Sequence, residues 1–159
     1  MRKVFVVVTG LLTLSTALQI YFAAMGVFSV PDDHLFVIHG TNGRIVLPIL
    51  VLLTILTAAL ARAGKRTIWL SVIVLGLLIL QTLFFILTGV IFGVTEESSE
   101  VPLGATLFVS LHGLNGLAII ALSATLFARA RRLAREPRET ARAAQAPTSP
   151  AEVNTVPRA

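Results

Sequence analysis

Long runs of apolar residues alternate with short polar breaks along most of the chain. Four runs are long enough to cross the apolar layer of a membrane, which takes about 20 residues of α-helix. They cover approximately residues 4–28, 35–61, 68–92 and 103–128. Because the breaks between them are short, neighbouring helices are expected to run antiparallel. The pattern therefore predicts an all-α membrane protein, a four-helix up-down transmembrane bundle.

The pattern changes after the fourth run. The segment 133–159 is rich in Ala, Pro, Arg and Thr and has no aromatic residue, so it cannot bury enough apolar surface to fold. We expect a transmembrane domain over 1–132 and a disordered basic tail over 133–159. The first apolar run exceeds the 7–15 residues typical of a signal peptide, so we expect it to remain as a helix.

Composition supports a membrane protein and excludes several kinds of site. The chain is 55% hydrophobic and 13% charged, with a mean hydropathy of +0.87, which is more apolar surface than a soluble domain of this length can bury. It has no cysteine, which excludes disulfides, thiolate metal sites, iron–sulfur clusters and c-type haem attachment.

The charged residues predict the orientation. All but one of the 13 basic residues lie before the first run, between the second and third, or after the fourth. The opposite two breaks carry the acidic residues Asp32, Asp33, Glu96, Glu97 and Glu100. By the positive-inside rule, both termini are cytoplasmic in a multi-pass plasma-membrane protein. The basic stretch after the fourth run is then a topology anchor that also contacts anionic lipid, and we expect no nucleic acid.

A polar motif occurs twice, as LFVIHGTNG (35–43) and LFVSLHGLNG (107–116). Each copy follows a helix with LQIYF (18–22) or LQTLF (80–84), then Gly-Val, an acidic break and a proline. The ordered match predicts two parallel two-helix repeats, related by a pseudo-twofold axis along the membrane normal. His39 and His112 are then equivalent residues at similar depth in the outer half of the membrane.

Two imidazoles on diagonal helices could bind both axial positions of one haem iron. Each histidine is followed by glycines, which cost about 1 kcal/mol each in a helix and make room either for a porphyrin face or for close helix packing. Asparagines stand three residues after each histidine, and could bond an imidazole, a propionate or a backbone carbonyl. These candidates are His39, His112, Gly40, Gly43, Gly113, Gly116, Asn42 and Asn115.

Further polar residues lie inside the predicted helices. Arg44 is a charge within a span, which costs roughly 2.5–3.5 kcal/mol and marks a functional candidate; its partner would be a haem propionate, another anion or a lipid headgroup. Pro48 removes the helix bond to the Arg44 carbonyl, which predicts a kink. Gln19 and Gln81 are either supporting groups of the site or interhelical hydrogen-bonding residues. His34 is expected at the interface.

Other readings of the histidine pair remain open. The rings could be structural hydrogen-bonding groups, ligands of copper or zinc, or part of a quinone or proton site. Copper and zinc are less favoured because neither motif holds a Cys, Met or carboxylate to complete a tetrahedral shell.

The arrangement of histidines on the second and fourth helices resembles one half of haem A synthase, and small b-type membrane cytochromes, over residues 1–130. The HGxNG motifs look like those of an uncharacterised actinobacterial family of four-helix membrane proteins. The resemblance implies haem b. Haem A synthases have an acid before the second-helix histidine and an arginine directly after it; here Gly40 follows His39, which argues against haem-modifying chemistry.

We therefore expect a b-type haem protein that acts in electron transfer or redox sensing. A single haem near one face would need a quinone or a membrane protein partner, and a homo-oligomer is left open. The chain shows no general acid or nucleophile inside the membrane, which argues against an enzyme. The alternative is an accessory subunit of a membrane complex, whose histidines are interhelical hydrogen-bonding groups.

Overall fold

The computed structural model describes residues 1–30, 33–95 and 98–144, and their side chains as far as Arg135. This part of the chain is helical and contains no strand. The elements are α1 (Arg2–Val27), α2 (Phe36–Thr41), the π-helix η2 (Asn42–Val46), α3 (Leu47–Leu60), α4 (Lys65–Phe92) and α5 (Leu103–Ala144).

Four helical segments of the described chain are long and apolar enough to cross a membrane. The second of these consists of α2, η2 and α3, which follow one another without a break. The segments are Arg2–Val27, Phe36–Leu60, Lys65–Phe92 and Leu103–Arg135. The prediction of an all-α membrane protein with four transmembrane helices is thus confirmed.

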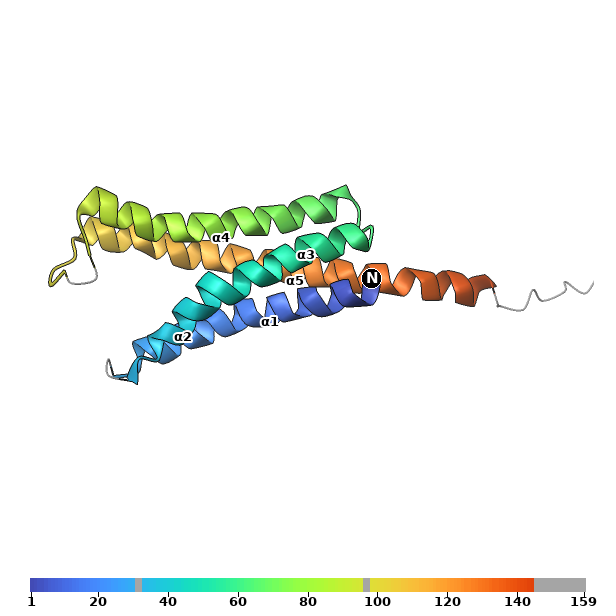
Figure 1. The fold of residues 1–159 in the computed structure, drawn as a ribbon, viewed down its shortest axis with the longest axis horizontal. Helices are drawn as coiled ribbons and strands as arrows, with labels where there is room; N and C mark the ends of the chain where they lie inside the picture. Colours follow the sequence, from blue (N-terminus) through green and yellow to red (C-terminus); the bar gives the residue numbers. More distant parts are fainter. Residues whose placement is uncertain (31–32, 96–97, 145–159) are drawn as a thin grey trace, which may run out of the picture.

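The helices form a closed square when viewed along the bundle. Helix α1 packs closely against α3 and α5, and α4 packs closely against the same two helices, whereas in the described part of the chain the backbones of α1 and α4, and those of α3 and α5, stay further apart. The second and fourth spans therefore stand at opposite corners. Figure 1 shows the start of α1 and the connection from α3 to α4 at the same end of the bundle.

The ends of α3 and α4 are formed by left-handed residues. After α3, the amides of Arg62 and Ala63 donate to the carbonyls of Ala59 and Ala58, both over 3.0 Å. Arg62 has φ of 54°, so the turn is a Schellman motif with arginine at the position that glycine usually occupies. Gly93 ends α4 with φ of 66°, where a side chain would be strained.

Helix α5 continues beyond the membrane-spanning segment. It extends to Ala144, so the first part of the predicted disordered tail is helical; the remainder, 145–159, lies outside the described residues. Pro137 has no N–H, which leaves the Leu133 carbonyl without its usual helical donor. The Arg2 guanidinium donates to this carbonyl over 3.2 Å and thereby connects α1 to α5.

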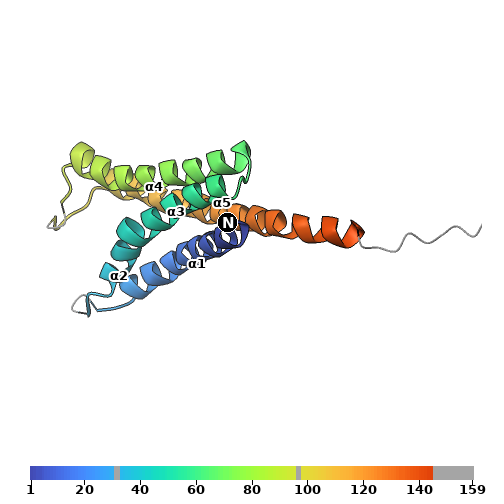
Figure 2. The same ribbon diagram turned by 45° about the vertical axis from the view of Figure 1, so that its right-hand side comes forward.

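The apolar core shared by all four helices extends from the middle of the bundle toward the end that holds the start of α1. Its larger cluster comprises Leu12, Leu47, Val51, Val74, Leu78, Ile119 and Leu126. A second cluster closer to that end comprises Phe5, Ala58, Ala61 and Ala130. Toward the other end, the pair formed by α1 and α2 diverges from the pair formed by α4 and α5 (Figures 1 and 2). Neither cluster extends into the divergent half.

Substituting Gly93→Ala should destabilise the protein by about 1–2 kcal/mol, because alanine is strained in the left-handed conformation. Gly76→Ala is the matched control, since an added methyl there meets no atom within 4 Å and alanine favours a helix interior by up to about 1 kcal/mol. Unfolding of detergent-solubilised protein, followed by helical circular dichroism, measures both. Equal effects of the two substitutions would contradict this account of the α4 end.

Candidate functional site

An irregular turn separates His39 from the rest of the second span. His39 lies in α2, and in η2 the amide of Leu47 donates to the Asn42 carbonyl, five residues earlier. Pro48 follows directly; it has no N–H, and its ring crowds the Arg44 carbonyl. The irregularity predicted at Pro48 therefore takes the form of a π-helix. The wider turn rotates the face that holds His39 and Asn42 relative to α3.

The ring of His39 is held by Gln19 of α1. Its Nδ1 lies 3.0 Å from the Gln19 backbone carbonyl, and because a carbonyl only accepts, Nδ1 carries the hydrogen. The Gln19 side-chain amide lies 3.3 Å from Nε2 and also donates to the His39 carbonyl over 2.9 Å. His39 is thus the tautomer whose Nε2 lone pair can accept a hydrogen bond or bind a metal.

Asn42 completes this cluster and is buried. Its amide nitrogen donates to the Ser15 carbonyl over 3.1 Å and to the Gln19 side-chain oxygen over 2.6 Å. The Ser15 hydroxyl in turn donates to the Asn42 side-chain oxygen over 2.8 Å. Hydrogen bonds therefore run from Ser15 through Asn42 and Gln19 to His39, and join α1 to α2 and η2.

The second hairpin, α4 and α5, contains the corresponding bonds. Asn115 is buried; its amide nitrogen donates to the Leu77 carbonyl over 2.8 Å and to the Gln81 side-chain oxygen. Gln81 then donates to the His112 carbonyl over 3.1 Å and its amide nitrogen contacts His112 Nδ1. Since an amide nitrogen only donates, His112 Nδ1 accepts, and the neutral ring carries its hydrogen on Nε2.

The two imidazoles meet where the hairpins diverge. The centroids of the His39 and His112 rings lie 6.0 Å apart, with an angle of 66° between their planes. Phe36 stacks on His39 at 5.2 Å, and Phe85 packs edge-on against His112 at 4.9 Å. A row of four aromatic rings thus crosses from one hairpin to the other.

Three of the four motif glycines do not serve close packing of helices within the chain. A Cβ added at Gly40, Gly113 or Gly116 would meet no atom within 4 Å. At Gly43 it would lie 2.9 Å from the Gln19 amide nitrogen, so this glycine leaves space for the amide that bonds His39. The sequence left two explanations for these glycines, room for a porphyrin or close helix packing. Close helix packing does not explain Gly40, Gly113 or Gly116.

The other two candidates are exposed residues. Arg44 is exposed on η2, and His34 is exposed in the turn before α2, with φ of 51°. Among the described residues, no group of three or more His, Cys, Asp or Glu side chains could hold a metal ion. A shallow pocket of about 300 Å³, lined in part by Phe22 and Val46, lies beside Asn42.

Sequence reasoning named Gln19 and Gln81 but missed the other contacts of the clusters, which come from Ser15, Leu77 and Phe85. Ser15 lies one helical turn before Gln19, and the residue at the equivalent position of the second hairpin is Leu77. Leu77 contributes only its backbone carbonyl, so the two positions share no residue type that a sequence comparison could detect. The repeated LFV instead suggests that Phe108 corresponds to Phe36. One additional residue separates Phe108 from its histidine, which rotates Phe108 by about 100° around the helix, and Phe85 contacts His112 in its place.

Comparison with known proteins gives one match. Residues 19–89 match a family of unknown function (DUF6220). The matched segment extends from Gln19 to Gly89 and therefore includes His39, Asn42 and Gln81, whereas His112 lies beyond it. No curated protein shows a significant match to the chain, and neither does any solved structure.

Replacing Gln81 with leucine tests how much its hydrogen bonds to Asn115 and His112 contribute to the stability of the protein. Gln81→Leu removes the acceptor of Asn115 and the donor to His112, and interhelical bonds of this type contribute about 0.6–2 kcal/mol in membrane proteins. We expect a loss of stability of that size, and less than additive effects with Asn115→Leu, because the two residues share one bond. The measurement is a double-mutant cycle of unfolding in detergent.

Thr82→Val is the matched control on the same helix turn, because Thr82 bonds only the Leu78 carbonyl of its own helix, over 3.5 Å. It should change stability by less than about 0.5 kcal/mol. Fully additive effects of the two leucine substitutions would show that Gln81 and Asn115 do not act as one cluster.

Proposed function

We propose that the protein binds one b-type haem between His39 and His112 and acts in electron transfer or redox sensing. The observation that carries the proposal is the 6.0 Å separation of the two ring centroids. Imidazole nitrogens bind metals at about 2 Å, so two rings on opposite sides of one metal have centroids about 6 Å apart. The haem would supply reversible one-electron chemistry.

Three features of the surroundings fit a planar ligand. The shared core of the bundle ends before the histidines, and α2, which holds His39, lies where the first hairpin diverges from α4 and α5 (Figure 2). Gly116 lies one turn from His112 on the same helix face, with open space above it. The aromatic rings of Phe36 and Phe85 would add apolar contacts around the axial imidazoles.

The hydrogen bonds of the two histidines make different demands on ligation. His39 already donates from Nδ1 to a carbonyl, the usual support for a histidine that binds metal through Nε2. The Gln19 amide, which lies 3.3 Å from Nε2, would have to move away from this nitrogen. His112 accepts at Nδ1, so ligation through Nε2 requires its hydrogen to move to Nδ1 and the Gln81 amide to present its oxygen. In this proposal Gln19, Gln81, Asn42 and Asn115 are positioning residues.

The corresponding hydrogen bonds of the two clusters support a duplicated hairpin with both copies inserted the same way up. The basic residues support cytoplasmic termini in the plasma membrane, and in this orientation the histidines would lie near the outer face. One haem at that depth cannot carry electrons across the membrane, so the proposal includes a quinone or a membrane protein as redox partner. The family of unknown function matched by residues 19–89 adds no activity to this proposal.

A second candidate is an accessory subunit of a membrane complex, without haem. The observation that favours it is the hydrogen bonding itself: Gln19 and Gln81 connect each histidine to the neighbouring helix. In this function the imidazoles are structural groups. The two candidate functions differ in whether the purified protein has the visible absorption bands of haem. They also differ in whether a haem occupies the open space at Gly116.

The first test is the reduced-minus-oxidised absorption spectrum of protein purified in detergent from haem-replete cells. We expect sharp bands of a low-spin b-type haem, lost in both His39→Ala and His112→Ala because each removes one of the two residues that would hold the haem. His34→Ala is the matched control and should keep the bands, since His34 is exposed and is not one of the two proposed ligands. A colourless, helical and monodisperse wild-type protein would refute haem binding and favour the accessory subunit.

Filling the space beside His112 separates haem binding from folding. Gly116→Leu adds a side chain where no atom lies within 4 Å of the Cβ, so its unfolding midpoint should equal or exceed that of the wild type. Its haem content should fall at least severalfold, because the leucine occupies the space that the macrocycle needs. Gly76→Leu, which is equally open and lies at an exposed position of α4, should keep full haem content. Unchanged haem content in Gly116→Leu would contradict the proposed position.

A further inference from the structure

A groove lies at the opposite end of the bundle from the histidines, between the first turns of α1 and the part of α5 that leaves the bundle. Its volume is about 340 Å³. It is lined by Lys3, Val6, Val7, Arg131, Ala134 and Arg135. These residues come from opposite ends of the chain, so only the packing of α1 on α5 forms the groove.

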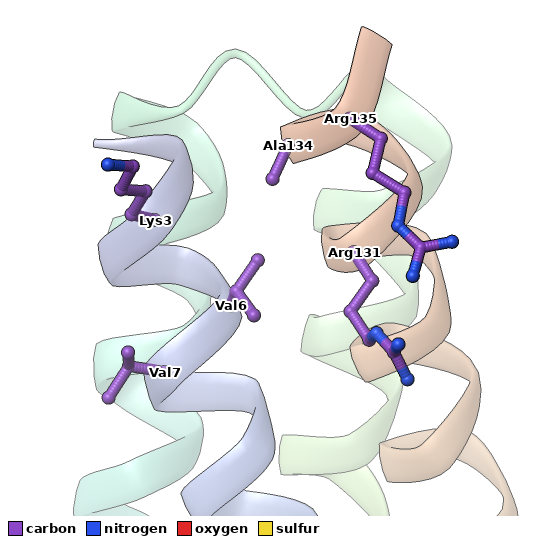
Figure 3. Close-up of a pocket in the computed structure, with 6 residues that line it drawn as sticks. All are labelled: Lys3, Val6, Val7, Arg131, Ala134 and Arg135. Carbon is purple, nitrogen blue, oxygen red and sulfur yellow. The ribbon is translucent and has the colours of Figure 1, made fainter. Parts of the chain in front are cut away.

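The groove combines an apolar floor with basic walls. Figure 3 shows Val6 and Ala134 pointing into the space between the two helices, with the side chains of Arg131 and Arg135 extending side by side along α5. The Arg131 guanidinium carbon lies 5.6 Å from the centre of the Phe127 ring, a cation–π contact that holds it beside an apolar surface. None of the described lining residues is acidic.

The groove also lies where each helix changes from apolar to charged. On α1, Lys3 is followed by Val6 and Val7; on α5, Phe127 is followed by Arg131 and Arg135. Both changes occur at the same end of the bundle (Figure 1). In a membrane this level is that of the lipid headgroups, where basic pockets between transmembrane helices recognise anionic lipids.

We propose that this groove is a specific binding site for one anionic phospholipid. Arg131 and Arg135, whose side chains lie along α5 (Figure 3), bind the single negative phosphate through paired N–H donors. Lys3 points away from α5 (Figure 3) and adds positive charge at the rim of the groove. Val6 and Val7 continue the groove toward the membrane interior and contact the acyl chains. A soluble phosphate would interact only with the basic side chains and would leave the apolar floor empty. The headgroup of a zwitterionic lipid carries a positive charge, which Lys3, Arg131 and Arg135 would repel.

Native mass spectrometry of the full chain in neutral detergent tests the proposal. Phosphatidylglycerol, phosphatidylcholine and inorganic phosphate are titrated separately, and bound adducts are counted. One phosphatidylglycerol should bind at least tenfold more tightly than phosphatidylcholine, and inorganic phosphate should give no stoichiometric adduct. Equal binding of the two lipids, or stoichiometric binding of phosphate alone, would overturn the proposal.

Two variants locate the site. Replacing Lys3, Arg131 and Arg135 together by Gln should weaken phosphatidylglycerol binding by about 100-fold, since each basic residue near an anionic lipid contributes a factor of about five. The matched control replaces Arg66, Arg129 and Arg132, which are exposed at the same end of the bundle but do not line the groove. It should bind within about threefold of the wild type.

Ala134→Phe keeps every charge and fills the groove floor, so it should weaken binding by at least tenfold. This variant keeps the test decisive if the triple variant does not insert. Wild-type affinity in Ala134→Phe, or equal losses in the two triple variants, would show that diffuse charge rather than this groove attracts the lipid.

Discussion

Each hairpin depends on satisfying polar side chains where lipid offers no hydrogen-bond partner. A glutamine, an asparagine and a histidine solve this problem together, because the asparagine amide is anchored on a backbone carbonyl and the glutamine amide passes the bonding on to the histidine. Breaking one bond would leave several buried polar groups unpaired at once. The clusters therefore hold α1 against α2 and η2, and α4 against α5, as two self-contained units.

Because each cluster uses its bonding groups internally, the two hairpins are joined to each other mainly by apolar packing. That packing extends from the middle of the bundle toward the end with the start of α1. At the other end the hairpins diverge, and the described contact between their clusters is the one between two imidazole rings. A bundle closed at one end and open at the other leaves room for a ligand beside the histidines without weakening the core.

The two proposed sites lie at opposite ends and depend on opposite properties. The haem site would use neutral imidazoles in an apolar setting with few charges, where metal ligation replaces hydrogen bonds that are already oriented. The lipid site would use fixed positive charges at the headgroup level. The basic groove draws on α1 and α5, one helix from each hairpin, so a bound lipid would strengthen the end at which the hairpins already meet.

Much of the fold was predictable from the order of residues alone. The number of spans follows from the length of apolar helix needed to cross a membrane, and the diagonal placement of the second and fourth spans follows from short connections. The same reasoning led to His39 and His112 and listed Gln19 and Gln81 as polar residues with two open roles. It ended the fourth helix too early, because the composition of 133–144 does not show that α5 continues there.

The sequence by itself determined which residues are polar inside the membrane and roughly how deep each lies, because hydropathy and helix rise are local properties. Only the tertiary structure decided which atoms bond, that Phe85 rather than Phe108 contacts His112, and that Lys3 shares a groove with Arg131. The physical reason is helical phase: one inserted residue, or the π-turn before Pro48, rotates a side chain by about 100°. Such a rotation changes which residues the side chain contacts, but it does not alter the hydropathy pattern of the sequence.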